Sequence, residues 1–222
     1  MRKSVKGLLL KDIKIIKSQM RFFLVTMIIV GMFLAGKFNQ TFFVGYTAVL
    51  SAFLLMTTFG FDEFENGFAF LFTLPISRKD YVAEKYLFGI LLVTVPFALV
   101  SICSWIALAV QDTEMHFVQY LVSVSSGIPM AFLILALEIP LQIKFGQAKS
   151  RLISVIMIAG MTTCLSLIGT LNAMSVADGM ESVSTIGRLG MGLWILMAVG
   201  VAAVLLFLSY TISCRIIEKK EF

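Results

Sequence analysis

The sequence predicts an all-α membrane protein with six transmembrane helices, an N-terminal amphipathic interfacial helix and a cytoplasmic helical segment between the second and third spans. The 222 residues are 59% hydrophobic and 14% charged, whereas soluble domains are about half apolar and a quarter charged. Six apolar stretches reach or approach the length of about 20 residues that a helix needs to cross a bilayer. Lys and Arg are concentrated in alternate connections between these stretches.

The apolar stretches lie between successive charged or His side chains, and we interpret each as one span. The first is the shortest, but the long side chains of Arg21 and Lys37 at its ends reach the headgroup region. A secretory signal peptide is the alternative interpretation of residues 1–36, which the long charged leader and the five later spans disfavour. Too few residues remain outside the lipid for a soluble domain, so we expect residues 1–222 to form one transmembrane domain. The spans are 22–36, 38–61, 86–111, 117–143, 152–177 and 189–214.

The distribution of Lys and Arg predicts the orientation of the chain. Of the 18 such residues, 16 lie in residues 1–21, 62–85, 144–151 and 215–222, which are on one side of the predicted membrane. Because Lys and Arg in short loops keep those loops on the cytoplasmic side, we expect both termini in the cytoplasm. The net charge of +5 is then a topology signal, and no nucleic-acid partner is expected.

The residues that catalysis requires are missing from the sequence. His116 is the only histidine, which excludes a histidine-pair zinc site, a His-based catalytic triad and a histidine proton relay. Residues 31–38 resemble a phosphate-binding loop, but Phe38 stands where that loop needs Ser or Thr. The three cysteines lack metal-ligand spacing. We therefore expect no catalytic site, no metal site and no cofactor on this chain.

Glu138 is the one carboxylate deep inside an apolar stretch. A charge at the bilayer centre costs about 2.5 to 3.5 kcal/mol or more, so Glu138 needs a partner, water or protonation. One interpretation is structural, with the carboxylate near the inner interface capping a neighbour or pairing with a basic residue. The other is a role in gating or in the transport path.

Residues 3–21 form an amphipathic helix when they are placed at 100° per residue. Lys and Arg occupy the opposite side and would face anionic headgroups, so the helix is expected to lie along the membrane surface. Asp12 falls inside the apolar arc, which indicates either a bend or a cationic protein partner, and the partner is favoured. A plain membrane anchor is the alternative role for the segment. The apolar arc contains Val5, Leu8, Leu9, Ile13, Ile16 and Met20.

Residues 61–86 predict a short helix, a hinge and a second helix start on the cytoplasmic surface. Phenylalanines recur at helical spacing, and acids crowd the expected helix start, where the helix dipole favours them. Pro75 ends this helix, and Ser77 with Asp80 forms a plausible N-cap pair for a helix from Arg78 into the third span. An exposed aromatic face indicates a docking site, unless the rings pack internally or lie in the interface. The rings are Phe61, Phe64, Phe68 and Phe72, and the acids are Asp62, Glu63 and Glu65.

Three short motifs give the chain a family resemblance. They are Leu-Pro-Ile-Ser-Arg at 74–78 with Tyr-Val at 81–82 and Lys-Tyr at 85–86, Leu-Leu-Leu-Lys-Asp at 8–12, and Pro-Leu at 140–141 followed by Lys-Phe-Gly and Lys-Ser-Arg at 144–151. In these and in its layout the chain resembles type-2 ABC exporter permeases, most closely the permeases of bacterial phenol-soluble-modulin-type peptide exporters.

The resemblance implies a dimer of permeases, either a homodimer or a paralogous heterodimer, in the bacterial cytoplasmic membrane. Two cytosolic ABC ATPase subunits would carry ATP and magnesium. Residues 3–21 would be the elbow helix, with Leu8, Leu9, Asp12, Ile13 and Ile16 in that role. Residues 62–73, within the coupling segment 62–85, would be the coupling helix that binds the ATPase, and 172–188 would re-enter the membrane. The docking residues would be Phe64, Phe68, Phe72, Leu74, Pro75, Ser77 and Arg78.

The predicted function is therefore the permease subunit of an ATP-driven exporter of an amphipathic or hydrophobic substrate, such as a peptide, a lipid or a drug. An apolar lining suits all three substrates, so the sequence does not choose among them. The alternative is a non-transporting membrane sensor, scaffold or immunity protein that docks a cytosolic partner through the aromatic loop.

Overall fold

The computed structural model describes residues 3–18, 21, 25, 40–64, 71, 73, 76–110, 117–125, 127–177 and 187–219, and all of these except 76 and 77 are helical. These residues form six α-helices and no strand. The helices are α1 (Lys3–Ser18), α3 (Gln40–Glu63), α5 (Arg78–Val110), α6 (Phe117–Ser125), α7 (Gly127–Ala177) and α8 (Gly187–Lys219).

Four helical segments in the described part of the chain are long and apolar enough to cross a membrane. A helix satisfies its backbone N–H and C=O groups internally, which the hydrocarbon core requires. The four segments correspond to the second, third, fourth and sixth predicted spans. They are Val44–Glu63, Arg78–Val110, Gly127–Gln147 and Leu196–Lys219.

The other two predicted spans have different outcomes. The first, 22–36, lies outside the described residues apart from Val25. The fifth, 152–177, is helical as the second part of α7.

The fourth predicted span, 117–143, is two helices instead of one. α6 ends at Ser125, and α7 begins at Gly127. Pro129 has no N–H to bond the carbonyl of Ser125, and its ring clashes with that carbonyl in a continuous helix. The break therefore has a local cause, and Pro129 lies in the first turn of α7, where a missing amide is tolerated.

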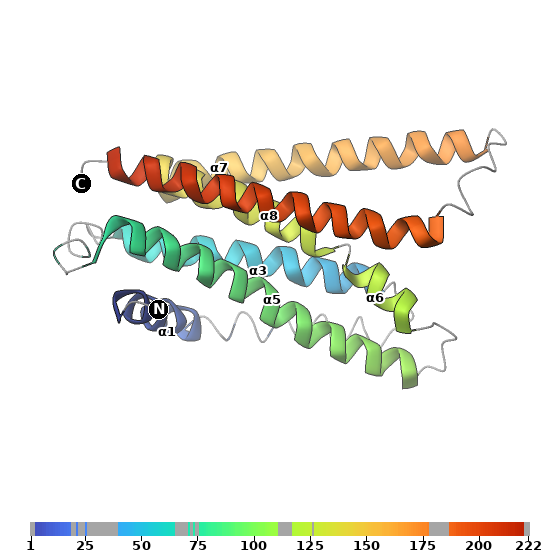
Figure 1. The fold of residues 1–222 in the computed structure, drawn as a ribbon, viewed down its shortest axis with the longest axis horizontal. Coiled ribbons are helices and arrows are strands. Elements are labelled where there is room, and N and C mark those ends of the chain that lie inside the picture. The colour runs from blue at the N-terminus through green and yellow to red at the C-terminus, as the bar shows by residue number, and fades with distance from the viewer. Residues whose placement is uncertain are drawn as a thin grey trace.

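α7 turns back on itself at Gly146, whose φ of 75° and ψ of 173° divide it into two arms. Figure 1 shows the first arm running from α6 toward the end of the bundle that carries α1, and the second arm running back. This backbone conformation is essentially restricted to glycine. Glu63 reinforces the turn because its Oε2 accepts a hydrogen bond from the Gln147 amide at 2.5 Å, so a carboxylate from α3 caps the start of the second arm.

α3 and the first arm of α7 lie side by side and run in the same direction. At one end a Cβ added to Gly127 would lie 2.8 Å from the Cα of Gly45, so the absence of side chains lets the two backbones approach closely. At the other end Glu63 bonds Gln147. α5 runs in the opposite direction beside them, whereas α8 runs in the same direction as α3 (Figure 1).

α5 begins where the Ser77 cap was predicted. The Asp80 amide donates to Ser77 Oγ at 3.0 Å, and the Tyr81 amide donates to the Ser77 carbonyl at 3.1 Å. The first bond satisfies an amide that has no partner within the helix, and the second is the first backbone bond of the helix itself. The cap fixes the entry of α5 into the bundle.

The main hydrophobic core joins α1, α3, α5, α7 and α8. Leu55 of α3 and Leu135 of α7 are fully buried, and both would contact a Cβ placed on Gly89 of α5. Leu8 brings α1 into the same cluster, and Ile217 brings in the last turns of α8. The core therefore extends to the end of the bundle where α1 lies.

Candidate functional site

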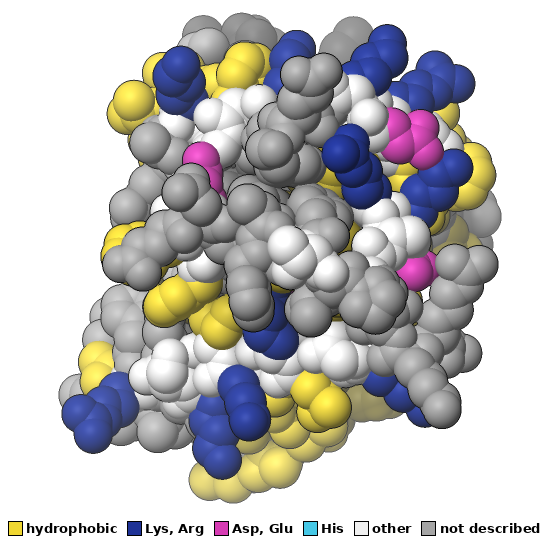
Figure 2. All heavy atoms as spheres, turned by 90° about the vertical axis from the view of Figure 1, so that its left-hand side faces the viewer, with side chains coloured by type: hydrophobic (Ala, Val, Ile, Leu, Met, Phe, Trp, Pro, Cys, Tyr) yellow, Lys and Arg dark blue, Asp and Glu magenta, His cyan; other side chains and the backbone are white. Residues whose placement is uncertain are grey.

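One end of the bundle gathers the cationic side chains. It is formed by α1, the last turns of α3 and α8, the first turns of α5 and the turn at Gly146 (Figure 1). We call it the basic end, and it contains the segments that the charge distribution predicted to be cytoplasmic. Figure 2 looks at this end and shows Lys and Arg side chains spread over it, with few Asp and Glu. Its exposed cations include Lys6, Lys14, Lys17, Lys79, Lys144, Lys149, Arg215 and Lys219.

A buried cluster of ion pairs lies behind this surface, with Lys85 of α5 at its centre. Lys85 and Asp12 of α1 have side chains that are 0% exposed, and they form an ion pair. Lys85 Nζ also lies 2.8 Å from Asp62 Oδ2 of α3 and donates to Thr58 Oγ1 at 3.2 Å. The ammonium lies 5.0 Å from the centre of the Phe59 ring, which adds a cation–π contact.

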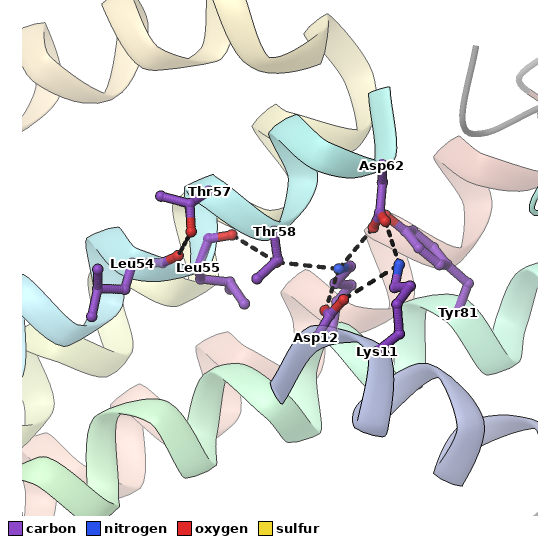
Figure 3. A network of polar contacts seen from close by, with 9 residues as sticks. Lys11, Asp12, Leu54, Leu55, Thr57, Thr58, Asp62 and Tyr81 are labelled. Carbon is purple, nitrogen blue, oxygen red and sulfur yellow. Dashed lines mark hydrogen bonds and ion pairs between the residues drawn. The ribbon is translucent and has the colours of Figure 1, made fainter. Parts of the chain in front are cut away.

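Lys11 and Tyr81 complete this cluster, which we call the α1–α3–α5 ion cluster (Lys11, Asp12, Thr58, Asp62, Tyr81 and Lys85). Lys11 pairs with Asp62 and lies 3.3 Å from Asp12. The Tyr81 hydroxyl donates to Asp62 Oδ2 at 2.9 Å. In Figure 3 the Lys11 side chain extends from α1 toward Asp62 of α3. Tyr81 of α5 lies beside the same carboxylate.

The cluster balances two lysines against two aspartates, so burial leaves no net charge among these four residues. Desolvation still opposes a buried pair, and removing one partner of such a pair costs about 3 to 5 kcal/mol because the other charge is left without compensation. The cluster therefore works as a connection that is expensive to break, and it joins α1, α3 and α5 at the basic end.

Helical spacing brings these residues together. Val5, Leu8 and Asp12 follow one another at intervals of three and four on α1, and all three are buried, so Asp12 lies on the inward face. Tyr81 and Lys85 are four residues apart on the first turns of α5 and share a face in the same way.

A protein-family comparison places the chain in a known group. The family model described as ABC-2 family transporter protein matches residues 7–218. The chain belongs to the ABC-2 transporter family. No curated protein and no solved structure matches the chain.

Membership and the four apolar helical segments make the chain an integral membrane protein and a permease component of an ABC transporter. Members of the ABC-2 family are membrane components of transporters and generally carry no catalytic site. Membership implies partnership with an ABC ATPase subunit.

Asp12 is the residue whose predicted environment changes most. The sequence favoured a cationic partner on another protein, whereas the partner is Lys85 of the same chain. In this ABC-2 permease the residues of the apolar arc of α1 also differ in how deeply they are buried. Leu8 is buried, while Ile13 is 45% exposed; Leu9 and Ile16 are partly buried against the core. α1 ends at Ser18, and residues 19 and 20 lie outside the described residues.

The acids expected at the start of a coupling helix occupy a different position. Asp62 and Glu63 form the end of α3, where the helix dipole opposes negative charge. Specific contacts offset that effect, because Asp62 binds Lys11, Lys85 and Tyr81, and Glu63 binds the Gln147 amide.

The predicted docking residues of the ABC-2 permease are only partly visible. Phe64 follows α3 directly and is 68% exposed. Arg78 donates to the carbonyls of Ile217 and Glu218, both at 3.0 Å, and so binds the end of α8, where free carbonyls and the helix dipole favour a cation. Ser77 caps α5. The docking residues outside the described set are Phe68, Phe72, Leu74 and Pro75.

Glu138 lies on the first arm of α7 and is 2% exposed. Over the described part of the chain, neither of its carboxylate oxygens has a hydrogen-bond partner, and the same holds for the amide of Gln142, one turn further on. The predicted cap or basic partner is thus not found among these residues. Whether Glu138 acts in gating stays a prediction.

Sequence reasoning missed the role of Lys85, which it counted only as a topology signal. A signal was present. Asp12 in an apolar arc requires a cation, and Lys85 begins the third span on the same predicted side of the membrane. What the sequence could not supply was the proximity of residues that are 73 positions apart.

Proposed function

We propose that the chain is the transmembrane permease subunit of an ATP-driven ABC exporter that moves an amphipathic or hydrophobic substrate out of the cell. In this proposal the basic end faces the cytoplasm of a bacterial cell and binds a separate ATPase subunit that carries ATP and magnesium. The α1–α3–α5 ion cluster is the observation that supports this function most directly.

The cluster lies beside the segment through which force would enter. α3 ends at Glu63 and α5 begins at Arg78, so a partner bound to the residues between them acts on both helix ends. Asp62 and Lys85 hold those ends together, and Asp12 adds α1. A displacement at this segment would therefore move three helices as a unit, which is what the transmission of nucleotide-driven closure to a membrane domain requires.

Phe64 is the described residue best suited to anchor the partner. Protein interfaces concentrate their binding energy in a few aromatic or Arg side chains that become buried on association. Phe64 is a large apolar side chain beside the ion cluster, and 68% of its surface is free for such burial. Phe68, Phe72, Leu74 and Pro75 complete the proposed coupling segment on the evidence of the resemblance.

The same resemblance supports peptide export, in the manner of phenol-soluble-modulin-type exporters, and a dimer of two permease copies. The second arm of α7 offers apolar surface for a second copy or for lipid, because Leu152 is 69% exposed and Ile156 is 70% exposed. The permease itself makes no covalent bond in this scheme, and transport is alternating access driven by the partner.

Copurification with a candidate ABC ATPase subunit from the same organism tests the proposal. The variant Phe64→Ala should lose ATPase binding, or should bind an ATPase whose hydrolysis no longer drives export from cells. The control is Phe207→Ala on α8, which removes an equally exposed ring, at 68%, about 18 Å from the helix end by helical rise. Phe207→Ala should retain both properties.

Thermal unfolding in detergent is measured on the same variants. Phe64→Ala with a wild-type melting temperature and lost coupling supports docking. If Phe64→Ala, Phe68→Ala and Phe72→Ala all bind the ATPase and export at the wild-type level, this segment does not couple the subunits. Loss of stability without loss of binding would show that the rings pack internally.

A further inference from the structure

An apolar pocket is lined by residues of α1, α3 and α5. Its volume is about 430 Å³, within the range of about 300 to 1,000 Å³ of small-molecule sites. Most of its described lining residues belong to α5, others belong to α1, and α3 contributes Leu54. The lining residues are Ile13, Ile16, Lys17, Leu54, Phe88, Leu91, Leu92, Val95 and Pro96.

The lining of the pocket is almost entirely apolar. Of the nine lining residues in the described part of the chain, eight are apolar and Lys17 is charged. Lys17 lies in the last turn of α1 and is exposed, so its ammonium is available at the rim of the pocket. No Asp or Glu is among the lining residues that the structure describes. A molecule that matches this site has a long apolar part and an anionic group at one end.

We propose that the pocket is a binding site for an anionic phospholipid, with an acyl chain among the α5 side chains and the phosphate against Lys17. α5 crosses the membrane and α1 is amphipathic at its surface, so the pocket lies where an acyl chain meets its headgroup. Pockets of this kind with a basic rim bind anionic headgroups on the cytoplasmic side of membranes. The site is distinct from the proposed docking segment, and its test does not require the ATPase.

The site also carries a consequence for α1. Ile13 and Ile16 line the pocket, while Asp12, the residue before Ile13, is held by Lys85. A bound lipid therefore contacts the same helix that the ion cluster connects to α3 and α5, and it stabilises the position of α1 against the bundle.

Photolabelling in proteoliposomes tests this site. The purified protein is reconstituted in phosphatidylcholine with a small fraction of phosphatidylglycerol that carries a diazirine in its acyl chain, and labelled residues are mapped by mass spectrometry. A phosphatidylcholine probe with the same chain gives the comparison. Phosphatidylglycerol should label α5 around Leu91 and Val95 more strongly than phosphatidylcholine does, and its addition in detergent should raise the melting temperature.

Lys17→Gln should lower labelling by phosphatidylglycerol about fivefold, as expected for one lost lysine–headgroup contact. The matched control is Lys6→Gln, which makes the same charge change on the same helix about 16 Å away and should leave labelling unchanged. Leu91→Trp and Val95→Phe fill the pocket and should abolish labelling by either probe. Both side chains are largely exposed, at 43% and 52%, so the protein should still fold.

Two results would overturn the proposal. Equal labelling by both probes, unaffected by Lys17→Gln, would show an apolar surface without headgroup recognition. Absence of lipid labelling, together with cross-linking of Ile13→Cys to a cysteine placed in residues 22–36, would show that the chain's own segment fills the pocket.

Discussion

At the scale of single residues, the surroundings of Lys85 govern the behaviour of the basic end. Its ammonium is enclosed by Asp12, Asp62 and Thr58 and lies over the Phe59 ring. An ammonium without such partners would be strongly disfavoured in this position. Its two aspartates depend on it in return, since Lys11 alone would then face both carboxylates.

Lys85→Gln should therefore lower the free energy of unfolding by about 3 to 5 kcal/mol, the usual effect of removing one partner from a buried ion pair. Denaturant unfolding in detergent measures it. The control is Lys79→Gln, whose partner Glu218 lies 3.1 Å away with both side chains largely exposed; its effect should stay within about 1 kcal/mol.

A double-mutant cycle separates the ion pair from general damage. Asp12→Asn combined with Lys85→Gln should destabilise the protein by less than the sum of the single changes, with a coupling of about 0.5 to 3 kcal/mol. Strictly additive losses would show that the two side chains do not act on each other.

Glu138 behaves differently because its oxygens have no hydrogen-bond partner among the described residues. Glu138→Gln replaces a buried carboxyl group with a neutral amide of similar size without breaking a contact seen there, so the melting temperature should be unchanged or higher. The matched control is Asp62→Asn, a buried carboxylate with several partners, which should melt earlier. Thermal unfolding is measured beside transport in proteoliposomes.

A Glu138→Gln variant that melts as early as Asp62→Asn would contradict this expectation and would indicate a structural partner for the carboxylate. Normal melting with lost transport would assign Glu138 to gating.

At the scale of elements, the turn at Gly146 joins two membrane-length helices with almost no connecting chain. A side chain at this φ and ψ costs about 1 to 3 kcal/mol, and an added Cβ would lie 2.3 Å from Glu63 Oε1. Gly146→Ala should therefore destabilise the protein, as measured by denaturant unfolding. In Gly200→Ala the new methyl meets no heavy atom within 4 Å, so that variant should be neutral or slightly more stable.

If Gly146→Ala and Gly200→Ala unfold at the same denaturant concentration, the turn does not depend on glycine. An effect confined to Gly146→Ala would show that the reversal of α7 is specified by this one position.

Local chemistry explains which elements were predictable from sequence. The four spans and the Ser77 cap depend on apolar length and on a side chain three residues from its partner amide, and both are visible in sequence. Predicting that α6 and α7 are separate helices required weighing one proline, Pro129, against a long apolar run. The fate of Asp62 was not predictable, because its three partners come from α1 and from α5, and periodicity carries no information about which helices become neighbours.

In the candidate site, too, local features were predictable from the sequence, whereas contacts between distant helices were not. Helical spacing identified α1 as amphipathic and Asp12 as anomalous, but the anomaly alone did not distinguish an internal partner from an external one. Phe64 was predicted to be exposed, and it is. The remaining rings of the aromatic face lie outside the described residues, so their docking role stays a prediction.

At the scale of the whole molecule, α1 and the last turn of α8 lie at the same end of the bundle. The exposed cations gather at that end (Figure 2), which is the arrangement expected of a cytoplasmic face. The orientation itself is a prediction that chemical labelling decides.

Single cysteines in a cysteine-free background should show this orientation. At Lys79, Lys149 and Lys219 they should resist a membrane-impermeant maleimide added to intact cells and react after lysis. Cysteines at Asp112 and Asp178, in the predicted outer connections, should react in intact cells. Labelling of the Lys79 position from outside would place the basic end away from the cytosol and remove the proposed ATPase contact.

The ion cluster also constrains the order in which the helices can pack while the protein is being synthesised. Asp12 leaves the ribosome 73 residues before Lys85, so α1 exists for that interval without the cation that neutralises its inward face. During this time Asp12 remains hydrated, and α1 rests at the membrane surface. Only when α5 has entered the bilayer do Lys85 and Tyr81 arrive to enclose Asp12 and Asp62. The position of the first helix to be synthesised is thus fixed only after α5 has been made, and a nascent chain that stalls before α5 lacks the ion pair that holds α1 against the bundle.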